Sequence, residues 1–576
     1  MTPEVFIQQK AAAAILAIYG TEVAESSLQV SVTRKEFEGD YTLVTFPLLK
    51  ITRQAPDATG HAIGAWLVDN VPEISAYNSV KGFLNLSFSP VYWNESLQAV
   101  AADENYGQLE STGRRIMVEF SSPNTNKPLH LGHIRNNLLG DSVSRILKAC
   151  GNEVVKATLV NDRGVHICKS MYAWEKLFDG ATPESTGKKG DHLVGDCYVA
   201  YAKLEKEHPE VSEEVHQMLV KWEEGDPQVR ALWSMMNGWV FQGFDQTYKA
   251  LGISFDKVDY EHDTYLLGKE LVQKGLDMGV FVKDPDGSVW CDLTADGLDR
   301  KLVLRGDGTS VYITQDLGTA ERRFSTYDLD SHVYVVGNEQ DYHFQVLKLI
   351  LKKLGFAWAE QIYHLSYGMV ELPEGKMKSR EGTVVDADDL IQSMYEEAKK
   401  TSEESGKLEG MPDEEKEALY HMIGLGALKY FIIKVDPRKT MLFNPKESID
   451  FNGNTGPFIQ YTHARICSIL RKATVAYGPD SVTLDAVPSA KEIRLVKLLG
   501  LYPAKVAEAG AALSPAVIAN YAYELAKEFN QYYHDTPILK EEDPAVLKYR
   551  LELIDTLART LRSAMALLGI QLPERM

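Results

Sequence analysis

Short apolar runs alternate with helical patterns between residues 116 and 370, and this alternation restricts the possible folds more than any other feature of the sequence. The runs that we predict as strands are 116–120, 153–160, 310–314, 332–336 and 364–370. Helical patterns separate several of them, as in residues 344–355. Because strand–helix–strand alternation is typical of parallel sheets with helices on both faces, we expect an α/β fold with a doubly wound parallel sheet.

The regions on either side of this predicted sheet have different patterns. Residues 1–112 combine an Ala-rich helix with alternating apolar residues, which predicts an N-terminal α+β domain. The polar run 111–115 links it to the sheet domain, residues 113–390, in which a Lys/Glu-rich interval at about 170–300 predicts a helical insertion. From about residue 385 strand patterns end. An all-helical domain over 391–576 is predicted by the amphipathic patterns at 457–474, 491–512, 516–535 and 545–568.

The charge of the chain is unevenly distributed. The formal net charge is −20, which argues against a general nucleic-acid coat protein, because such a protein needs a basic surface. From Thr455 to the C-terminus, however, basic and acidic residues nearly balance, so the acidic excess lies in the preceding part of the chain. The helical region can therefore contact an RNA through local cations, while the acidic remainder would repel unrelated RNA.

The cysteines do not form a pattern that holds a metal or a disulfide framework. They are odd in number, scattered and without a C-x-x-C pair, so we expect no structural zinc and no metal site. The five are Cys150, Cys168, Cys197, Cys291 and Cys467. The apolar run at residues 11–19 is too short to span a bilayer and predicts an amphipathic helix. These features predict a cytoplasmic protein with no membrane partner.

The segment His130-Leu-Gly-His133 follows the first predicted strand and a Ser-Ser-Pro-Asn loop, and a helix is expected to begin near Gly132. The N-terminus of a helix offers free N–H groups and a positive dipole end, which suit phosphate. The two imidazoles can donate to a phosphate oxygen as charge builds in a transition state, and Lys127 adds a mobile cation. Gly132 permits close approach of a nucleotide. The alternative, that the histidines are ordinary surface or core residues, fits the strand–loop–helix context less well.

Residues 130–133 resemble the HIGH signature of class I aminoacyl-tRNA synthetases. The longer string from Glu119 through Ser-Ser-Pro-Asn and Lys127-Pro to Arg135 is similar to arginyl-tRNA synthetases specifically, and the resemblance covers most of the chain. It implies a Rossmann-like catalytic domain over 113–390. It also implies residues for catalysis, namely His130, His133 and Lys127, and for ATP binding, namely His130, Gly132, His133 and Met369.

A second motif, Lys376-Met-Lys-Ser-Arg380, follows the last predicted strand. A basic loop can close over a polyphosphate and neutralise the charge of the leaving pyrophosphate. This loop resembles the KMSKS signature of the same class, which implies that Lys376 and Lys378 are catalytic and bind ATP. It departs from the signature at Ser379, where the family pattern has a lysine. The resemblance assigns a compensating role to Lys127, and which cation serves the pyrophosphate stays open.

Recognition of an arginine side chain requires carboxylates and carbonyl-type acceptors, because the guanidinium is a planar group of five donors. Two segments resemble the substrate-binding strings of the family, and they contain Tyr312, Asp316 and Gln340. The resemblance implies that Asp316 binds the guanidinium with Tyr312 beside it. It further implies contacts to the polar groups of the substrate, including its α-amino end, from Gln340, Asn124, Ser122 and Glu119.

Two regions are implied to contact tRNA. From about residue 455 the tail resembles the anticodon-binding helical domain of arginyl-tRNA synthetases, and Tyr461 and Arg465 share one helical face there, where an aromatic ring and a cation can stack on unstacked bases. A solvated helix face is the alternative. In the N-terminal domain Phe83 and Asn85 resemble the part of the family that meets the tRNA elbow. A core strand with Phe83 buried is equally compatible with the sequence.

The resemblance implies an arginine–tRNA ligase. Such an enzyme activates L-arginine with ATP, accompanied by Mg²⁺, to arginyl-adenylate and transfers arginine to the 3′-terminal ribose of its tRNA. We expect a monomer whose partners are tRNA for arginine, L-arginine and ATP. Two alternatives remain at this point: a nucleotidyltransferase of the same H-x-G-H superfamily and a non-catalytic tRNA-binding paralogue. The first would lack the helical tail, and the second should have lost the catalytic residues.

Overall fold

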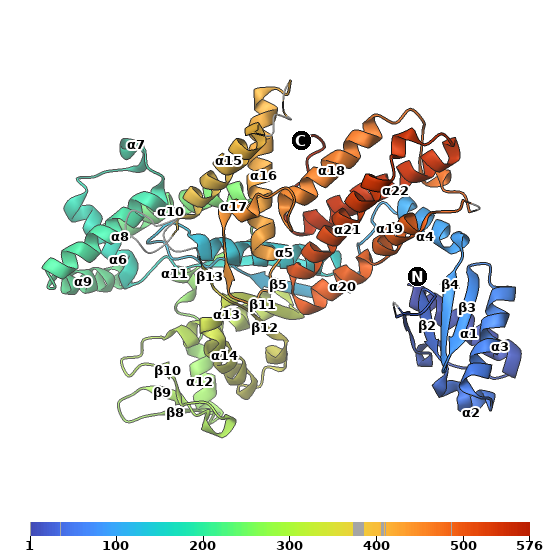
Figure 1. Ribbon diagram of the computed structural model, residues 1–576. Coiled ribbons are helices and arrows are strands. Elements are labelled where there is room, and N and C mark those ends of the chain that lie inside the picture. The colour runs from blue at the N-terminus through green and yellow to red at the C-terminus, as the bar shows by residue number, and fades with distance from the viewer. Residues whose placement is uncertain (1, 35, 372–384, 405–407, 409, 485) are drawn as a thin grey trace.

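The computed structural model describes residues 2–34, 36–371, 385–404, 408, 410–484 and 486–576. Lys376 and Lys378 of the second motif lie outside the described residues. The chain forms four regions: an N-terminal α+β domain, a central parallel sheet with its helices, a helical and β insertion between strands of that sheet, and a C-terminal group of helices (Figure 1).

The centre of the molecule is a five-stranded sheet in which every neighbouring pair is parallel, with the order β12-β11-β5-β6-β7. Its strands are β5 (Arg115–Glu119), β6 (Glu153–Val160), β7 (Lys257–Tyr260), β11 (Ser331–Gly337) and β12 (Ile362–Tyr367). The strand order reverses between β5 and β11. This is the doubly wound arrangement expected from the sequence, in which ligands bind outside the carboxyl ends of the strands at the point of reversal.

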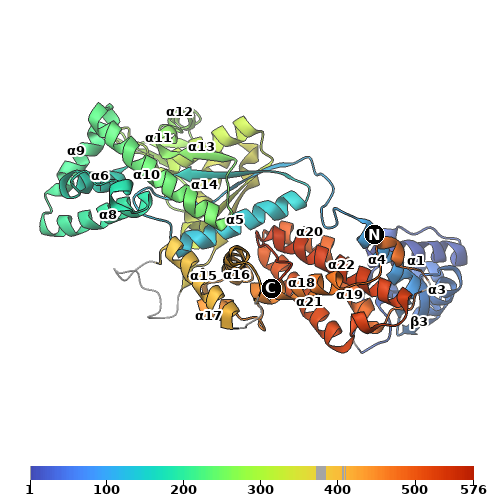
Figure 2. The same ribbon diagram turned by 90° about the horizontal axis from the view of Figure 1, so that it is seen from above.

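Helices cover both faces of the sheet, and the strands alternate their apolar side chains accordingly. Ile116 and Val118 of β5 belong to the core that contains α5 (Leu131–Ala149). Met117, between them, belongs to a second core with α13 (Tyr312–Tyr327) and α14 (Asp341–Lys353). In the view from above, α5 lies on one side of the strands, and α13 and α14 lie on the other (Figure 2).

The prediction of one helical insertion at about 170–300 is only partly correct. Helices occupy the connection from β6 to β7, but β7 itself is a strand of the central sheet, and an antiparallel sheet of order β10-β9-β8 follows it. The helices before β7 are α6 (Val165–Leu177), α7 (Pro183–Thr186), α8 (Gly190–Glu207), α9 (Val211–Glu224) and α10 (Pro227–Leu251). After it come α11 (Glu261–Thr264), α12 (Lys269–Asp277), β8 (Phe281–Lys283), β9 (Val289–Cys291) and β10 (Lys301–Leu304). The sequence pattern did not predict β7, because this strand is short and its buried residue is the charged Asp259 rather than part of an apolar run.

Two further strand predictions differ from the structure. Residues 310–314 are not a strand, because α13 begins at Tyr312. The hydroxyl of Thr314 accepts the main-chain N–H of Val311 at 3.2 Å and so caps this helix, which outweighs the β preference of the segment. The predicted strand 364–370 is divided into β12 and β13 (Val370–Glu371). Gly368 separates the two and leaves no room for a side chain, since an added Cβ would lie 2.6 Å from the main chain of Lys439.

The N-terminal domain is a four-stranded antiparallel sheet with helices packed on it. Its order is β1-β2-β4-β3, and its strands are β1 (Val30–Val32), β2 (Tyr41–Val44), β3 (Ile74–Val80) and β4 (Phe83–Phe88). The helices are α1 (Pro3–Tyr19), α2 (Leu49–Thr52), α3 (Pro56–Asn70) and α4 (Pro90–Ala102). The domain meets the C-terminal helices through α4, where the Asn94 amide donates to the carbonyls of Leu484 and Ala486.

Helices, most of them long, form the C-terminal region. They are α15 (Ala387–Glu404), α16 (Asp413–Ile433), α17 (Pro445–Ser448), α18 (Gly456–Arg471), α19 (Ala490–Gly500), α20 (Tyr502–Ala512), α21 (Pro515–Asp535) and α22 (Pro544–Leu567). The single helix predicted at 491–512 is divided at Leu501, because Pro503 has no N–H to continue the ladder. One short strand, β14 (Met441–Leu442), pairs with β13. Among the residues that the structure describes, no helix has the length and apolar content needed to cross a membrane.

Candidate active site

His130 and His133 form a reciprocal cap at the N-terminus of α5. The main-chain N–H of His130 donates to Nδ1 of His133 at 3.2 Å, and Nδ1 of His130 accepts the N–H of Gly132 at 3.1 Å. The two ring centroids lie 3.9 Å apart. The two imidazoles thus satisfy the N–H groups of His130 and Gly132 at the start of the helix, and each ring is oriented by a main-chain hydrogen bond.

Both imidazoles are neutral at physiological pH. Burial, with a smaller contribution from the Lys127 cation, lowers the pKa of His130 to about 4. Burial also lowers the pKa of His133 well below its ordinary value. Because Nδ1 of each neutral ring accepts a main-chain N–H, the proton is on Nε2. The site therefore presents two Nε2–H donors near the cation of Lys127, which suits an anion in front of the helix.

Gly132 is required by the histidine cap itself. A Cβ added to this residue would lie 3.0 Å from Cε1 and 3.1 Å from Nδ1 of His130. Any larger residue would therefore displace the ring that caps the helix. The sequence interpretation was that Gly132 lets a nucleotide approach, and the structure adds this second reason for the glycine.

The chain that follows the second motif lies beside the first motif. Leu131 donates its N–H to the carbonyl of Val385, and Ala387 donates to the carbonyl of Leu129, both at 2.9 Å. His130 and Asp386 face each other in this short antiparallel ladder. The first signature segment is therefore joined through the main chain at His130 to residues 385–387, which follow the second motif in the sequence.

Arg135 is a positioning residue that the sequence analysis quoted but to which it gave no role. Its side chain is fully buried on α5 and donates to the carbonyls of Met369, Pro437 and Lys439 at 3.1, 3.0 and 2.7 Å. Met369, expected at the ATP site, is half exposed. The guanidinium of Arg135 thus holds the segment that carries Met369 against the helix of the two histidines.

The loop after β5 is shaped by two residues in the left-handed region, Ser121 and Ser122, with φ of 72° and 45°. The Asn136 side chain stabilises the turn by accepting the N–H of Ser121 and donating to the carbonyl of Val335 on β11. The hydroxyl of Ser122 donates to Glu119, and the next polar residue of the loop, Asn124, is exposed. The loop therefore presents Asn124 at the point where the strand order reverses.

Glu119, at the end of β5, lies in a buried ion-pair network. Arg323 is 1% exposed in its side chain and pairs with both Glu119 and Asp259 of β7, the latter at 2.9 Å. Burial opposes the charge of this guanidinium, but the two carboxylates outweigh it and raise the pKa of Arg323. In this structure one oxygen of Glu119 pairs with Arg323 and the other accepts from Ser122.

Asp316 lies in the second turn of α13, whose N-terminus is at the carboxyl edge of the sheet. Its carboxylate pairs with Nε2 of His343 on α14 at 2.6 Å and is partly exposed. Tyr312, at the start of the same helix, is 76% exposed, and Gln340, which follows β11, is also exposed. These side chains are accessible to a ligand at the edge where β5 and β11 end.

Glu261 is a carboxylate that the sequence analysis missed. It directly follows β7 and is 9% exposed. Burial raises its pKa to about 7; Arg163 lowers it, and the nearby carboxylates of Asp162 and Asp316 raise it further. A buried carboxylate near Asp316 is an arrangement in which a cation would be bound strongly. The only signal in the sequence is its position after a strand, and that strand was not recognised.

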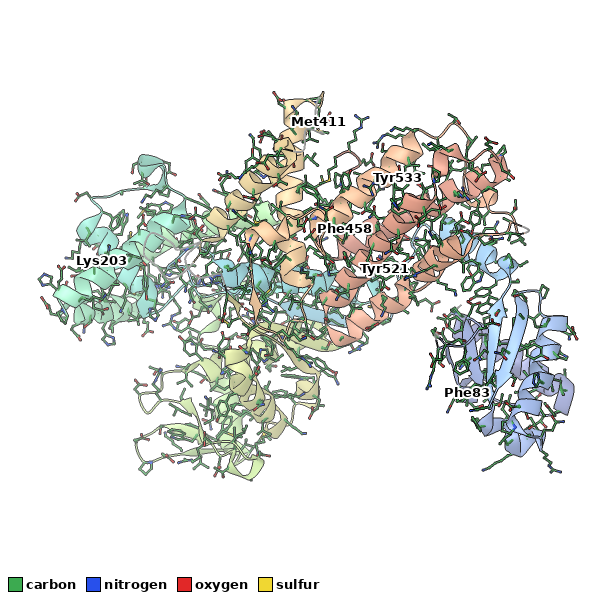
Figure 3. The ribbon with its side chains drawn as sticks, viewed as in Figure 1. Phe83, Lys203, Met411, Phe458, Tyr521 and Tyr533 are labelled. Carbon is green, nitrogen blue, oxygen red and sulfur yellow. The ribbon has the colours of Figure 1, made fainter. Side chains whose placement is uncertain are left out.

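The two residues expected to meet the tRNA elbow differ in accessibility. Phe83 is 42% exposed on the N-terminal domain and packs edge-on against Phe46 (Figure 3). Asn85, on the same face of β4, is 2% exposed, and its side-chain oxygen accepts the hydroxyl of Thr42 at 2.6 Å. A Cβ on Gly39 would lie 3.0 Å from the Cβ of Asn85, so the Gly39 segment covers it. Phe83 is accessible at the surface, whereas Asn85 lies beneath the Gly39 segment.

Tyr461 and Arg465 of α18 lie together, as their helical spacing predicts. The guanidinium of Arg465 is 4.8 Å from the ring centroid of Tyr461 and 5.6 Å from that of Tyr533 on α21, which Figure 3 labels. It also donates to the side-chain oxygen of Asn530. The cation is therefore held between two aromatic rings at the contact of two helices of the tail.

Two family models match the chain, one over the central sheet region and one over the C-terminal helices. The family model described as "tRNA synthetases class I (R), catalytic domain" matches residues 96–444, and the "DALR anticodon binding domain" matches residues 459–576. An arginine–tRNA ligase of Bacteroides thetaiotaomicron is 56% identical to the chain, with 99% of the chain and 100% of that relative covered. The chain belongs to the arginine–tRNA ligase family. A second member, from Porphyromonas gingivalis, is 54% identical over 99% of each chain.

Solved structures agree with this membership. The arginyl-tRNA synthetase of Thermus thermophilus is 26% identical and superposes with a TM-score of 0.77, covering 100% of both chains. The enzyme of Plasmodium falciparum, at 20% identity and a TM-score of 0.76, shares the fold over 99% of this chain. The resemblance drawn from the two signature motifs is confirmed, and the chain is a class I aminoacyl-tRNA synthetase.

Proposed function

We propose that the chain ligates arginine to its tRNA in two steps at the carboxyl edge of the central sheet. Arginine and ATP first give arginyl-adenylate and pyrophosphate, and the 3′-terminal ribose of the tRNA then attacks the activated carbonyl. The observation that carries this proposal is the reciprocal cap of His130 and His133, because it offers two neutral Nε2–H donors at a helix N-terminus beside Lys127. Adenylate formation needs mainly positioning and charge stabilisation, which these groups supply.

In the first step the α-carboxylate of arginine attacks the α-phosphorus of ATP, and the bond to pyrophosphate breaks. Negative charge builds on the phosphate oxygens, to which the Nε2–H groups of His130 and His133 donate. Lys127 supplies a positive charge without a fixed geometry. We include Gly132 and Met369 in the ATP site, together with Lys376 and Lys378 of the second motif. Mg²⁺ enters with ATP and is held through its phosphates.

Arginine specificity comes from acidic groups at the ends of the strands. We assign the guanidinium to Asp316 and Glu261, because a group of five donors needs more than one carboxylate to be satisfied. Tyr312 and Gln340 lie at the accessible rim of this region. We assign contacts with the polar groups of the substrate, including its α-amino group, to Asn124, Ser122 and Glu119. The carboxylate of Glu119 also pairs with Arg323, so it must serve both groups.

For the tRNA we propose contacts at both ends of the molecule. Phe83 stacks on a base near the elbow, and Tyr461 with Arg465 stacks on the anticodon. Asn85 contributes only if the segment around Gly39 moves. We divide the chain at the boundaries 1–112, 113–390 and 391–576, with anticodon binding from about 455. The proposed enzyme acts as a cytoplasmic monomer.

The decisive experiment is aminoacylation of tRNA with labelled arginine, together with arginine-dependent ATP–pyrophosphate exchange in the presence of tRNA. We expect charging with arginine and none with lysine, since lysine lacks the planar fork that two carboxylates bind. Absence of charging above background, with folded protein and cognate tRNA, would overturn the proposal.

A further inference from the structure

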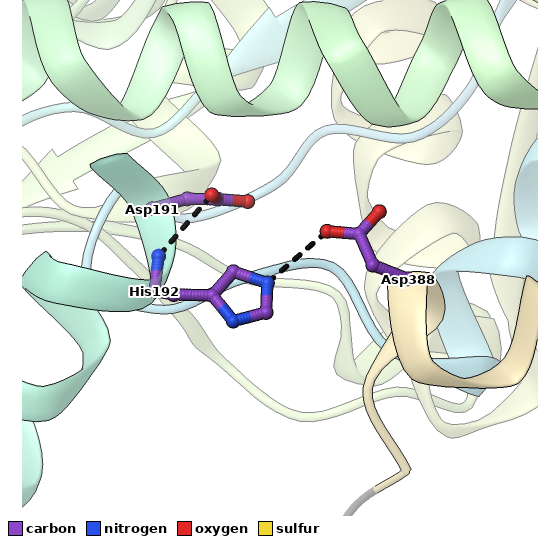
Figure 4. A group of neighbouring side chains, drawn as sticks. All are labelled: Asp191, His192 and Asp388. Atoms are coloured by element: carbon purple, nitrogen blue, oxygen red, sulfur yellow. Dashed lines mark hydrogen bonds and ion pairs between the residues drawn. The ribbon is translucent and has the colours of Figure 1, made fainter. Parts of the chain in front are cut away.

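A partly buried polar cluster joins the helical insertion to the chain that follows the second motif. Lys189, which precedes α8, places its ammonium 2.5 Å from the hydroxyl of Thr247 on α10, 2.6 Å from Asp388 on α15 and 3.2 Å from Asp191. His192 adds a fourth member, with Nε2 at 3.1 Å from the same Asp388 oxygen (Figure 4). The ammonium therefore has three acceptors and Asp388 has three donors, so the cluster is fully connected.

The ammonium of Lys189 supplies the positive charge that balances the carboxylates of this cluster. Asp191, His192 and Asp388 place one ligand atom each within 4.8 Å of one another, which is close enough for a metal ion. Lys189, however, already donates to both carboxylates. Burial opposes the charge of Asp388, but hydrogen bonds from His192 and Lys189 lower its pKa to about 2. A neutralised, hydrogen-bonded cluster of this kind fixes geometry rather than binding a further cation.

The cluster is continuous with the main-chain ladder at His130. Asp386 accepts the N–H groups of Asp388 and Asp389 at 2.8 and 3.2 Å, and so caps the start of α15. Nε2 of His192 is also 3.4 Å from Asp386. Asp386 faces His130 in the ladder and lies two residues before Asp388. A shift of the start of α15 would therefore also shift the residue that caps α5.

Helix α8 also packs on the residues that lead into the first motif. A Cβ on Gly195 of α8 would lie 2.9 Å from Cδ of Pro128 and 3.7 Å from Cα of Lys127. The glycine thus allows α8 to pack on the chain that leads to His130. Within its first two turns α8 therefore contacts the chain that leads to His130 and, through His192, the start of α15.

We propose that Lys189 is a positioning residue for adenylate formation. Through Asp388 it fixes the start of α15, and with it the ladder on which His130 lies, so that the helical insertion sets the position of His130 relative to the chain that follows the second motif. This inference rests on the proposed function, and the wild-type exchange assay tests that function separately. If Lys189 acts in this way, its loss lowers transition-state stabilisation while arginine binding, which lies at α13 and β7, is preserved.

The test compares Lys189→Met with Lys189→Arg in arginine-dependent ATP–pyrophosphate exchange with tRNA. We expect Lys189→Met to lower kcat by about tenfold or more while KM for arginine stays within about twofold. Lys189→Arg should restore most of kcat, because arginine can donate to the same acceptors. The matched control is Lys169→Met. Lys169 lies on α6, and its side chain is about as exposed as that of Lys189. It pairs with Glu205 of α8 at 3.0 Å and, in the part of the chain that the structure describes, makes no ion pair with α15.

A double variant tests whether Lys189 acts through Asp388. If it does, Lys189→Met with Asp388→Asn loses no more kcat than the more impaired of the two single variants. Thr247→Val, which removes one donor from Asp388, is the milder second variant if Lys189→Met does not fold, and it should lower kcat by about threefold at unchanged KM for arginine. Wild-type kcat in Lys189→Met or Thr247→Val, an equal loss in Lys169→Met, or additive losses in the double variant would overturn the proposal.

Discussion

The main-chain N–H of His130 donates to Nδ1 of His133 at 3.2 Å, so the second histidine of the motif holds the residue that carries the first. Nδ1 of His130 in turn caps Gly132, and among the described residues no hydrogen bond uses Nε2 of either ring. Capping and the proposed catalytic contacts therefore use different nitrogens of the same rings. The two roles can be separated by substitution, which makes this contact the best starting point for tests.

His130→Asn should remove catalysis while preserving the helix cap. Asparagine is a favoured N-cap residue, so its side-chain oxygen can accept from α5, but it lacks a donor at the position of Nε2. We expect kcat in ATP–pyrophosphate exchange to fall by about a hundredfold or more, as when one oxyanion donor is lost. The melting temperature should stay within a few degrees of wild type. His166→Gln, at an exposed histidine of α6, is the control and should leave kcat unchanged. Near wild-type kcat in His130→Asn would contradict the assignment.

Asp316→Asn should weaken arginine binding. Removal of a charged partner from a guanidinium costs about 2 kcal/mol, or roughly thirtyfold in KM for arginine. The check is steady-state aminoacylation with arginine varied. His343→Gln should have a smaller effect, because His343 contacts Asp316 rather than the substrate in this assignment. Asp277→Asn on the exposed face of α12 serves as the control. A KM within about threefold of wild type in Asp316→Asn would exclude the role.

The raised pKa of Glu261 leads us to predict that arginine binding depends on pH. The pKa of its carboxyl group is raised to about 7 in the free protein, so the group becomes protonated as the pH falls below 7. Because a cationic substrate needs the ionised form, KM for arginine should rise by up to about tenfold per pH unit below 7. In Glu261→Gln the KM should be higher at pH 8 and nearly independent of pH between 6 and 8. An unchanged pH profile in this variant would refute the assignment.

The same group makes a prediction for stability. Its pKa is higher in the folded than in the unfolded chain, so the folded protein binds more protons. The contribution of Glu261 to the free energy of unfolding is therefore largest at low pH and is lost as the pH rises through the window from about 4.5 to 7. Thermal unfolding of Glu261→Gln, which cannot ionise, should show a smaller decrease over this window than wild type. An identical pH dependence of the two melting temperatures would be the contrary result.

Phe83 and Asn85 should respond differently to substitution. Phe83→Ala removes an exposed ring and is expected to raise KM for tRNA, since stacking of a base on an aromatic ring contributes about 1–3 kcal/mol. Its melting temperature should change little. Asn85→Ala breaks the hydrogen bond with Thr42 in a buried position and should lower stability by about 1 kcal/mol. Unfolding curves and aminoacylation with tRNA varied distinguish the two effects. If Phe83→Ala leaves KM for tRNA unchanged, Phe83 has no role in tRNA binding.

The parts of the fold that sequence patterns predicted correctly are those governed by local signals. The strand before the first motif, the helix after it and the helices of the tail follow from apolar periodicity and from capping residues close in sequence. Periodicity failed at 310–314, where a cap from Thr314 to Val311 outweighed β propensity. It failed again at β7, whose buried residue is charged.

The sequence by itself determined the family, the two signature motifs and the helical tail, because each depends on residues that are near one another along the chain. Tertiary structure decided which distant groups complete the site. The charge of Asp316 acts on Glu261, Arg135 donates to the carbonyl of Met369, and Lys189 donates to Asp388 only because the sheet and its insertion bring these groups together. The physical reason is that a parallel sheet gathers the carboxyl ends of its strands at one edge. Burial and pairing at that edge, which no local pattern records, then fix the charge of each side chain.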